Sequence, residues 1–140
     1  VAQALAALGL TRGLVVHGLG PHGEPMDEIS PFGPTFAASI DVGGRVTPLE
    51  LDPGELGVRT LEPASVAPAT TVAENAARIR AILSGADDPA RELIALNAGA
   101  ALWIAGRVAD IRTGLAHARN ELGSGRPRKC LDRLAEAAPR

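Results

Sequence analysis

The chain has 140 residues, the length of one domain, and 46% of them are hydrophobic while 21% are charged. This balance allows a real core and argues against a disordered chain. A net charge of −2 offers no positive field to nucleic acid, and 2% aromatic residues are too few to stack single-stranded bases. A single cysteine, Cys130, excludes an internal disulfide framework and fits a reducing, cytoplasmic compartment. No uncharged stretch reaches the ~20 residues of a membrane span, so we expect neither nucleic acid nor membrane as a partner.

The first segment predicts a helix over Ala2–Leu8, ended by Gly9. The apolar run Leu14–Val16 predicts a short buried strand, and we expect it to be parallel to its neighbours. Because the chain opens with Val1 rather than Met, we expect the natural N-terminus to lie upstream.

The stretch Gly18–Pro34 contains four prolines and four glycines, which predicts a long loop with little strand pattern. Long ordered loops in compact domains are usually functional. Gly18-x-Gly20-x-x-Gly23 matches a dinucleotide-binding fingerprint in letters, but the prolines that follow exclude the helix that this site requires. We therefore interpret these glycines as loop residues.

The next segment favours a β-hairpin, with arms 36–42 and 45–51 around Gly43-Gly44. Pro48 places the second arm at a sheet edge. Asp52 and Pro53 predict one capped helical turn, and 60–70 is expected to be irregular.

The remainder predicts four helices. Thr71 and Glu74 form a capping box before a helix whose apolar stripe is Val72, Ala76, Ile79 and Leu83. The helix over 89–105 is apolar nearly all round, so we expect it to be central, with Ile94 and Leu102 more costly to truncate than Leu115 of the next helix. Asp110 caps that next helix, and Ser124 precedes a last one with Leu131 and Leu134 inward.

This order predicts an α/β protein, in which one buried strand and a β-hairpin are packed by several helices. Three or more strands are normally needed for a stable sheet. We therefore expect the chain to be the C-terminal portion of a larger α/β domain.

The adjacent carboxylates Asp27 and Glu28 are the sharpest candidate site, because they follow a buried strand in a loop where α/β proteins bind ligands. Hard oxygen ligands suit Mg²⁺, which usually takes one or two carboxylates plus phosphate oxygens and waters. Alternatively, the pair is a solvated acidic turn. His17 and His22 could hold a transition metal, but their spacing fits no standard zinc pattern.

Several segments in order together resemble anthranilate phosphoribosyltransferases, and they cover nearly all of the chain. They are Leu14-Val15-Val16-His17-Gly18, Met26-Asp27-Glu28-Ile29-Ser30, Glu74-Asn75-Ala76-Ala77, Asn97-Ala98-Gly99-Ala100-Ala101-Leu102, and Gly114-Leu115-Ala116-His117-Ala118 through Ser124-Gly125. The resemblance implies a nucleoside-phosphorylase-type fold and transfer of phosphoribose from phosphoribosyl pyrophosphate to anthranilate, in tryptophan biosynthesis, with Mg²⁺.

By this resemblance Asp27 and Glu28 would bind Mg²⁺. Residues 1–140 would form the C-terminal part of the α/β domain, without the N-terminal helical domain through which the family dimerises and without its pyrophosphate-binding loop. We carry over no catalytic or other cofactor-binding residue, and we expect the chain alone to be inactive. The loop between Gly18 and Asp27 is longer than is usual in the family.

Two other functions remain open at this point. A pyrimidine nucleoside phosphorylase shares the implied fold and would take a nucleoside and phosphate. A transferase-like protein without catalysis would serve as a binding or assembly module.

Overall fold

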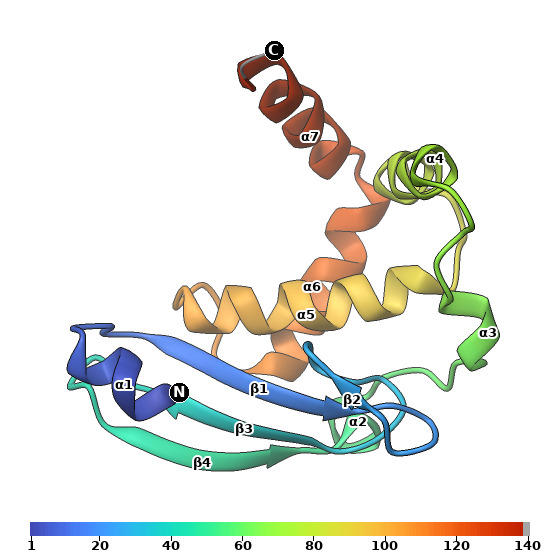
Figure 1. Ribbon diagram of the computed structural model, residues 1–140. Coiled ribbons are helices and arrows are strands. Elements are labelled where there is room, and N and C mark those ends of the chain that lie inside the picture. The colour runs from blue at the N-terminus through green and yellow to red at the C-terminus, as the bar shows by residue number, and fades with distance from the viewer. Residues whose placement is uncertain (139–140) are drawn as a thin grey trace.

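The computed structural model describes residues 1–138, and its strands form one antiparallel sheet in the order β2-β1-β3-β4. The strands are β1 (Gly13–Leu19), β2 (Pro25–Met26), β3 (Thr35–Ile40) and β4 (Val46–Leu51). The helices are α1 (Ala2–Ala7), α2 (Pro53–Leu56), α3 (Pro63–Val66), α4 (Val72–Leu83), α5 (Ala90–Ile104), α6 (Ile111–Gly123) and α7 (Arg126–Ala137). Helix α5 runs along the sheet and α6 crosses α5, while α4 and α7 lie farther from the sheet (Figure 1). The expected α/β class is confirmed.

The expectation that β1 is a parallel strand is wrong, since it pairs antiparallel with both β2 and β3. A short link suits antiparallel neighbours, whereas parallel strands need a crossover of roughly a dozen residues or more. Here Gly20 donates its N–H to the carbonyl oxygen of Glu24 (2.7 Å), which turns the chain directly from β1 into β2. The glycines of the fingerprint-like segment therefore build a turn, and the segment expected to be loop throughout contributes the end of β1 and all of β2.

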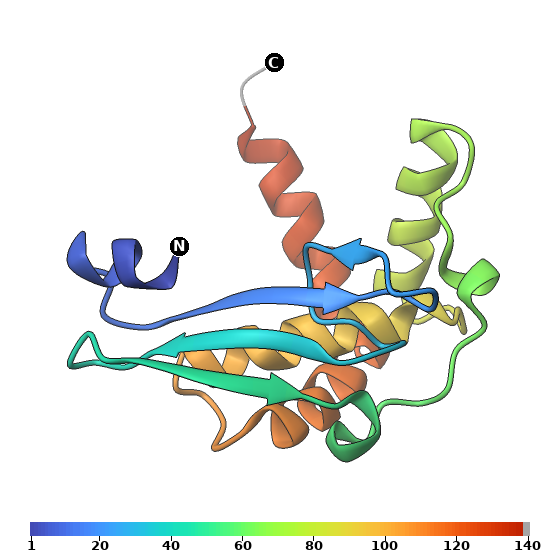
Figure 2. The ribbon, with the colours of Figure 1, turned by 60° about the horizontal axis from the view of Figure 1, so that its bottom comes forward.

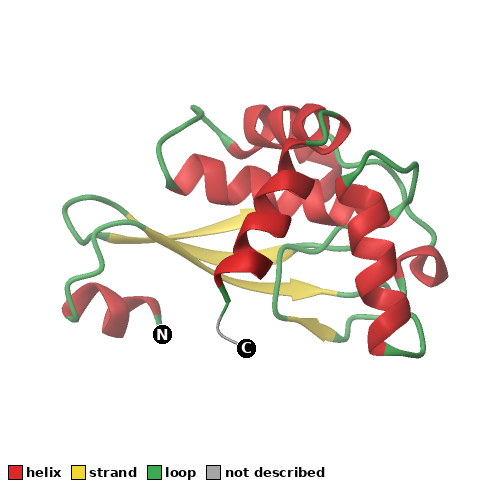
Figure 3. Cartoon of the chain, turned by 90° about the horizontal axis from the view of Figure 1, so that it is seen from above, coloured by secondary structure: helices red, strands yellow, loops and turns green. Residues whose placement is uncertain are grey.

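The apolar run in β1 reflects cover on both faces of the sheet rather than strand direction. Leu14 and Val16 are half-buried against the core under the helices, and Val15 is half-buried on the opposite face with Ala2 and Phe36, so the strand is less buried than expected. Figure 2 brings the sheet in front of α5 and α6, and α1 stands apart from the other helices in Figure 3. Side-chain burial, which the pattern records, is thus compatible with either strand direction.

Most local signals are confirmed. The hairpin of β3 and β4 turns at Asp41–Arg45, and Pro48 lies on the edge strand β4. Asp52, Thr71 and Asp110 each cap a helix through a side-chain oxygen, and Thr71 forms the full capping box with Glu74. The short helix α3 within the stretch expected to be irregular was missed; its first residue is a proline, which suits a helix start.

The core lies between the sheet and the pair α5–α6. Leu96 and Leu115 are fully buried, and Ala37 and Leu51 of the sheet pack against the same cluster. Helices α5 and α6 meet at two glycines: a Cβ on Gly114 would lie 2.3 Å from the carbonyl oxygen of Gly99. The absence of both side chains lets the two backbones approach this closely.

Three expectations about helix faces are wrong. Helix α5 is not buried all round, since Ile94 and Leu102 are only half-buried whereas Leu115 of α6 has no exposed surface. On α4 the buried residue is Ile82, while Val72 is 87% exposed. On α7 Leu134 is 67% exposed instead of inward. The physical reason is that α4 and α7 extend away from the sheet, so apolar spacing on them has little core to meet (Figure 1).

Candidate functional site

Asp27 and Glu28 follow β2 directly, where the chain leaves the sheet and passes over the middle of α5. Asp27 is exposed and Glu28 is half-buried, and the next residue, Ile29, is buried in the core. Burial raises the pKa of Glu28 above its ordinary value, and the negative charge of Asp27 raises it further. A cation beside the pair would relieve both effects, because it favours the charged form of each carboxyl group.

The peptide group between Glu28 and Ile29 is held at both of its ends. A Cβ on Gly18 would lie 2.4 Å from the carbonyl oxygen of Glu28, so only glycine lets this oxygen pack against β1. The N–H of Ile29 donates to Oδ1 of Asn97 on α5 (2.9 Å). The carboxylate pair is therefore tied to the strand and to the helix through the backbone.

The following peptide group is held in the same way. Nδ2 of Asn97 donates to the carbonyl oxygen of Ile29 (3.2 Å), and the N–H of Ser30 donates to Oγ1 of Thr35 (2.9 Å). The buried Ser30 hydroxyl donates to the carbonyl oxygen of Leu19 (2.5 Å). Sequence reasoning missed Ser30 and Thr35, whose only signal is their polar type in an otherwise apolar setting.

Three segments far apart in sequence therefore converge at this site: the end of β1, the stretch Asp27–Ser30, and Asn97 of α5. The other motif residues behave differently. His17 and His22 are exposed, and within residues 1–138 no group of three or more histidine, cysteine, aspartate or glutamate side chains is arranged to hold a metal ion.

The carboxylate pair fits Mg²⁺ by its donor chemistry. None of the five ion pairs found in residues 1–138 involves Asp27 or Glu28, so no basic side chain there neutralises them. Two carboxylates without a third protein ligand suit an ion that completes its shell with phosphate oxygens and waters. They do not suit structural zinc, which takes four protein ligands.

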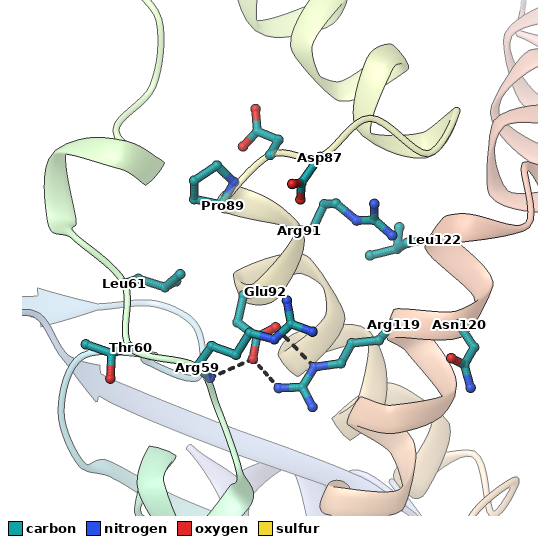
Figure 4. A pocket seen from close by; sticks show the side chains of 11 residues that line it. Arg59, Thr60, Leu61, Asp87, Pro89, Arg91, Glu92, Arg119, Asn120 and Leu122 are labelled. Carbon is teal, nitrogen blue, oxygen red and sulfur yellow. Dashed lines mark hydrogen bonds and ion pairs between the residues drawn. The ribbon is translucent and has the colours of Figure 1, made fainter.

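A second candidate is a pocket of about 490 Å³ between the start of α5, the end of α6 and the segment 59–61. Figure 4 shows Arg59 and Arg119 converging on Glu92. Glu92 is buried, forms an ion pair with Arg119, and accepts a hydrogen bond from the N–H of Arg59 (2.8 Å). Burial acts to raise the pKa of Glu92, but hydrogen bonds from Arg119 and Arg59 outweigh it, so this pKa lies below its ordinary value.

Most charged side chains of this pocket already bind other groups of the protein. Arg119 also donates to the carbonyl oxygen of Gly57 (2.8 Å), and Arg91 donates to the carbonyl oxygens of Gly85 and Ala86. Asp88 pairs with Arg78 of α4. The pocket joins α5, α6 and the chain after α2, and we interpret it as a structural junction.

Residues 1–128 match the profile of a family described as "Glycosyl transferase family, a/b domain". The chain belongs to this family. Among the members it resembles, the anthranilate phosphoribosyltransferase of Azorhizobium caulinodans is 39% identical over 137 residues, and that of Sorangium cellulosum is 42% identical over 134 residues. These matches cover 98% and 95% of this chain but only 38% and 36% of the relatives.

Solved structures of anthranilate phosphoribosyltransferases share the fold. The crystal structure of anthranilate phosphoribosyltransferase from Thermus thermophilus superposes with a TM-score of 0.74 and 34% identity, covering 94% of this chain and 37% of the other. The Saccharomyces cerevisiae enzyme in complex with 4-fluoroanthranilate superposes with a TM-score of 0.73 over 92% of this chain and 36% of the other. Its identity is 23%, so it supports the fold alone.

Proposed function

We propose that this chain is the C-terminal part of the α/β domain of an anthranilate phosphoribosyltransferase, in which Asp27 and Glu28 bind Mg²⁺. The enzyme would transfer phosphoribose from phosphoribosyl pyrophosphate to anthranilate in tryptophan biosynthesis. One observation carries the proposal: a carboxylate pair without an ion-pair partner in residues 1–138 is locked to β1 and α5, in a chain whose curated relatives bear this enzyme's name.

The sheet itself supports a larger domain. On the side away from β3, β1 pairs with β2 only at Gly18 and Leu19, so its edge over 13–17 has no strand partner within residues 1–138. Beside this edge lies an apolar pocket of about 280 Å³, lined by Leu14, Val16, Ile29 and residues of α5. An open strand edge with apolar surface beside it favours further strands, and the chain spans only about 37% of the length of its relatives.

The proposed chemistry concerns the leaving group. Phosphoribosyl transfer builds positive charge on the sugar and negative charge on the departing pyrophosphate. Bound Mg²⁺ would supply positive charge to the pyrophosphate oxygens. Asp27 and Glu28 would anchor that ion, and the backbone hydrogen bonds of the 28–30 segment would keep the two carboxylates in place while pyrophosphate leaves. A variant of the yeast enzyme, 21% identical to this chain, has a structure with Mg bound.

The test uses the full-length enzyme that contains this segment. Asp27→Asn with Glu28→Gln should keep the fold, because both changes nearly conserve side-chain size and neither residue is buried, and should lower turnover while raising the Mg²⁺ concentration needed for half activity. The loss of anthranilate fluorescence follows the reaction. The control is Glu50→Gln with Glu136→Gln, which removes two exposed carboxylates elsewhere and should leave the Mg²⁺ dependence unchanged. Unchanged Mg²⁺ dependence in the first variant would refute the metal role.

The 140-residue chain by itself should catalyse no transfer at any Mg²⁺ concentration. Two carboxylates do not bind the two phosphates of pyrophosphate unless a pyrophosphate-binding loop also supplies N–H groups and cations. Turnover by this chain alone would contradict the proposal.

As part of the same proposal, the enzyme is a cytoplasmic homodimer that dimerises through its N-terminal domain and takes no nucleic acid or membrane as a partner. No helix described in residues 1–138 is long and apolar enough to cross a bilayer.

A further inference from the structure

Asn97 makes three hydrogen bonds that join the carboxylate loop to the middle of α5. Its Oδ1 accepts from the N–H of Ile29 (2.9 Å), and its Nδ2 donates to the carbonyl oxygens of Ile29 and of Leu93 (3.2 Å each). The two bonds to Ile29 satisfy both backbone groups of one residue with one amide. They span 68 positions in sequence, so they define where the loop sits on the helix.

The side chains of Asp27 and Glu28 are not held in place by ion pairs of their own. Asp27 is exposed, and neither Asp27 nor Glu28 takes part in an ion pair within the described part of the chain. Their positions relative to each other and to β1 therefore depend on the backbone at 28–30. That backbone is fixed by Asn97 on the side of α5, and on the side of the sheet by the contact of Glu28 with Gly18 and by the hydrogen bonds of Ser30.

We infer that Asn97 is a positioning residue for the Mg²⁺ site, acting through the backbone of Ile29 and not through the metal. The inference rests on the proposed function of Asp27 and Glu28. Carboxylates held in advance lose less conformational freedom when they bind the ion, and groups behind metal ligands commonly contribute about 10-fold or more in metal affinity. Removing the amide should therefore weaken metal binding while both ligands remain.

The chain contains a matched control in α4. Oδ1 of Asn75 accepts from the N–H of Ala69 (2.9 Å), and its Nδ2 donates to the carbonyl oxygens of Ala69 and of Thr71 (3.0 Å each). The pattern is the same as at Asn97, with one loop residue bonded twice and one carbonyl four residues earlier. The loop that Asn75 holds carries no carboxylate pair, so Asn75→Ala removes the same contacts without touching the proposed site.

The experiment compares Asn97→Ala, Asn97→Asp and Asn75→Ala in the full-length enzyme. Three quantities are measured: Mn²⁺ binding in the presence of pyrophosphate by electron paramagnetic resonance, the Mg²⁺ concentration for half activity, and hydrogen exchange in the segment 27–30. Asn97→Ala should weaken Mn²⁺ binding about 10-fold, raise the half-activating Mg²⁺ concentration, and speed exchange in 27–30. At saturating Mg²⁺ its turnover should approach that of the parent enzyme, and Asn75→Ala should change none of these.

Asn97→Asp keeps the size and the acceptor for the Ile29 N–H, but it replaces the donor by an oxygen that faces the carbonyl oxygens of Ile29 and Leu93, so it should also weaken Mn²⁺ binding. If Asn97→Ala does not fold, Asn97→Asp carries the test. Mn²⁺ affinity in the Asn97 variants that matches Asn75→Ala would overturn the inference. The carboxylate double variant separates the two proposals: if it changes Mg²⁺ dependence and the Asn97 variants do not, only the positioning role fails; if it does not, the metal site fails first.

Discussion

Helices α4 and α5 use the same local device in opposite surroundings. Each carries an asparagine whose side-chain amide bonds twice to one residue of an earlier loop and once to its own helix. Helix α5 packs against the sheet and α6, with Leu96 fully buried, whereas α4 extends away from the sheet and leaves Val72 87% exposed. The hydrogen bonds alone do not distinguish the two helices, but their burial does.

The comparison shows that such asparagine hydrogen bonds matter for function only through the segment that they hold. On α5 the amide of Asn97 holds the backbone beside two carboxylates, and Leu96 of the same helix is fully buried in the core. On α4 the amide of Asn75 holds the loop that precedes a helix with few buried residues. We therefore expect substitutions in the α5 region to be costly and those in the α4 region to be tolerated.

The largest loss of stability is expected for Gly114→Val, at the contact of α6 with α5. The new side chain would meet the backbone of Gly99, so the two helices would have to separate. We expect a loss of about 3 kcal/mol or more in the free energy of unfolding, measured by urea denaturation. Helix propensity favours valine over glycine, so the loss would come from packing. The control Ala77→Val, exposed on α4, should cost under about 1 kcal/mol; equal losses would remove the contrast.

Truncations of apolar side chains test the same difference between the α5–α6 core and α4. Leu96→Ala and Leu115→Ala should each cost about 2–5 kcal/mol, because both residues have no exposed surface and their removal leaves a cavity. Leu102→Ala should cost less, since Leu102 is only half-buried. Val72→Ala on α4 should change stability by under about 0.5 kcal/mol. A larger loss at Leu102 than at Leu115 would contradict the burial order.

The ion pair of Glu92 with Arg119 gives a prediction that depends on pH. Glu92→Gln should cost about 2 kcal/mol near neutral pH; the figure is below that for a fully buried pair because Arg119 is partly exposed. The pKa of Glu92 is lowered in the folded state, so its contribution is present above its ordinary pKa and is lost as pH falls through the folded-state pKa. The difference between the parent and Glu92→Gln should therefore shrink in acid, as urea denaturation at several pH values would reveal.

The corresponding pair of α4, Arg78 with Asp88, is the control. The hydrogen bond from Arg78 lowers the pKa of Asp88, so its contribution should fade in the same direction in acid. Because both side chains are more exposed than Glu92, Asp88→Asn should cost less than Glu92→Gln. A larger effect at Asp88 would mean that the α4 junction, and not the buried carboxylate, limits stability.

The smallest expected effect is at the start of α4. Thr71→Ala removes the capping box with Glu74 and should cost about 1 kcal/mol in thermal or urea unfolding. Thr70→Ala, one residue earlier and exposed, should cost little. Thr71→Ala should also leave the Mg²⁺ dependence of the full-length enzyme unchanged, since α4 takes no part in the proposed site. A shift in that dependence would show that the two helices are coupled.

Elements whose causes are local could be predicted from the sequence. The capping box at Thr71, the cap at Asp52, the hairpin around Gly43-Gly44 and the edge position of Pro48 all follow from neighbouring residues, and the structure has each of them. The sequence also singled out Asp27 and Glu28 as a candidate pair, because two adjacent carboxylates in a segment rich in proline and glycine can be read directly from it.

Tertiary structure alone decided the direction of β1, the exposed faces of α4 and α7, and the holding of the carboxylate loop. Apolar spacing records that a side chain prefers burial, but whether a partner surface exists depends on where the helix is placed. Asn97 and Asn75 look alike in sequence and bond alike in space. Only the packing of α5 against the sheet brings Asn97 to Ile29, across 68 residues, because such a contact has no local cause that a sequence pattern could carry.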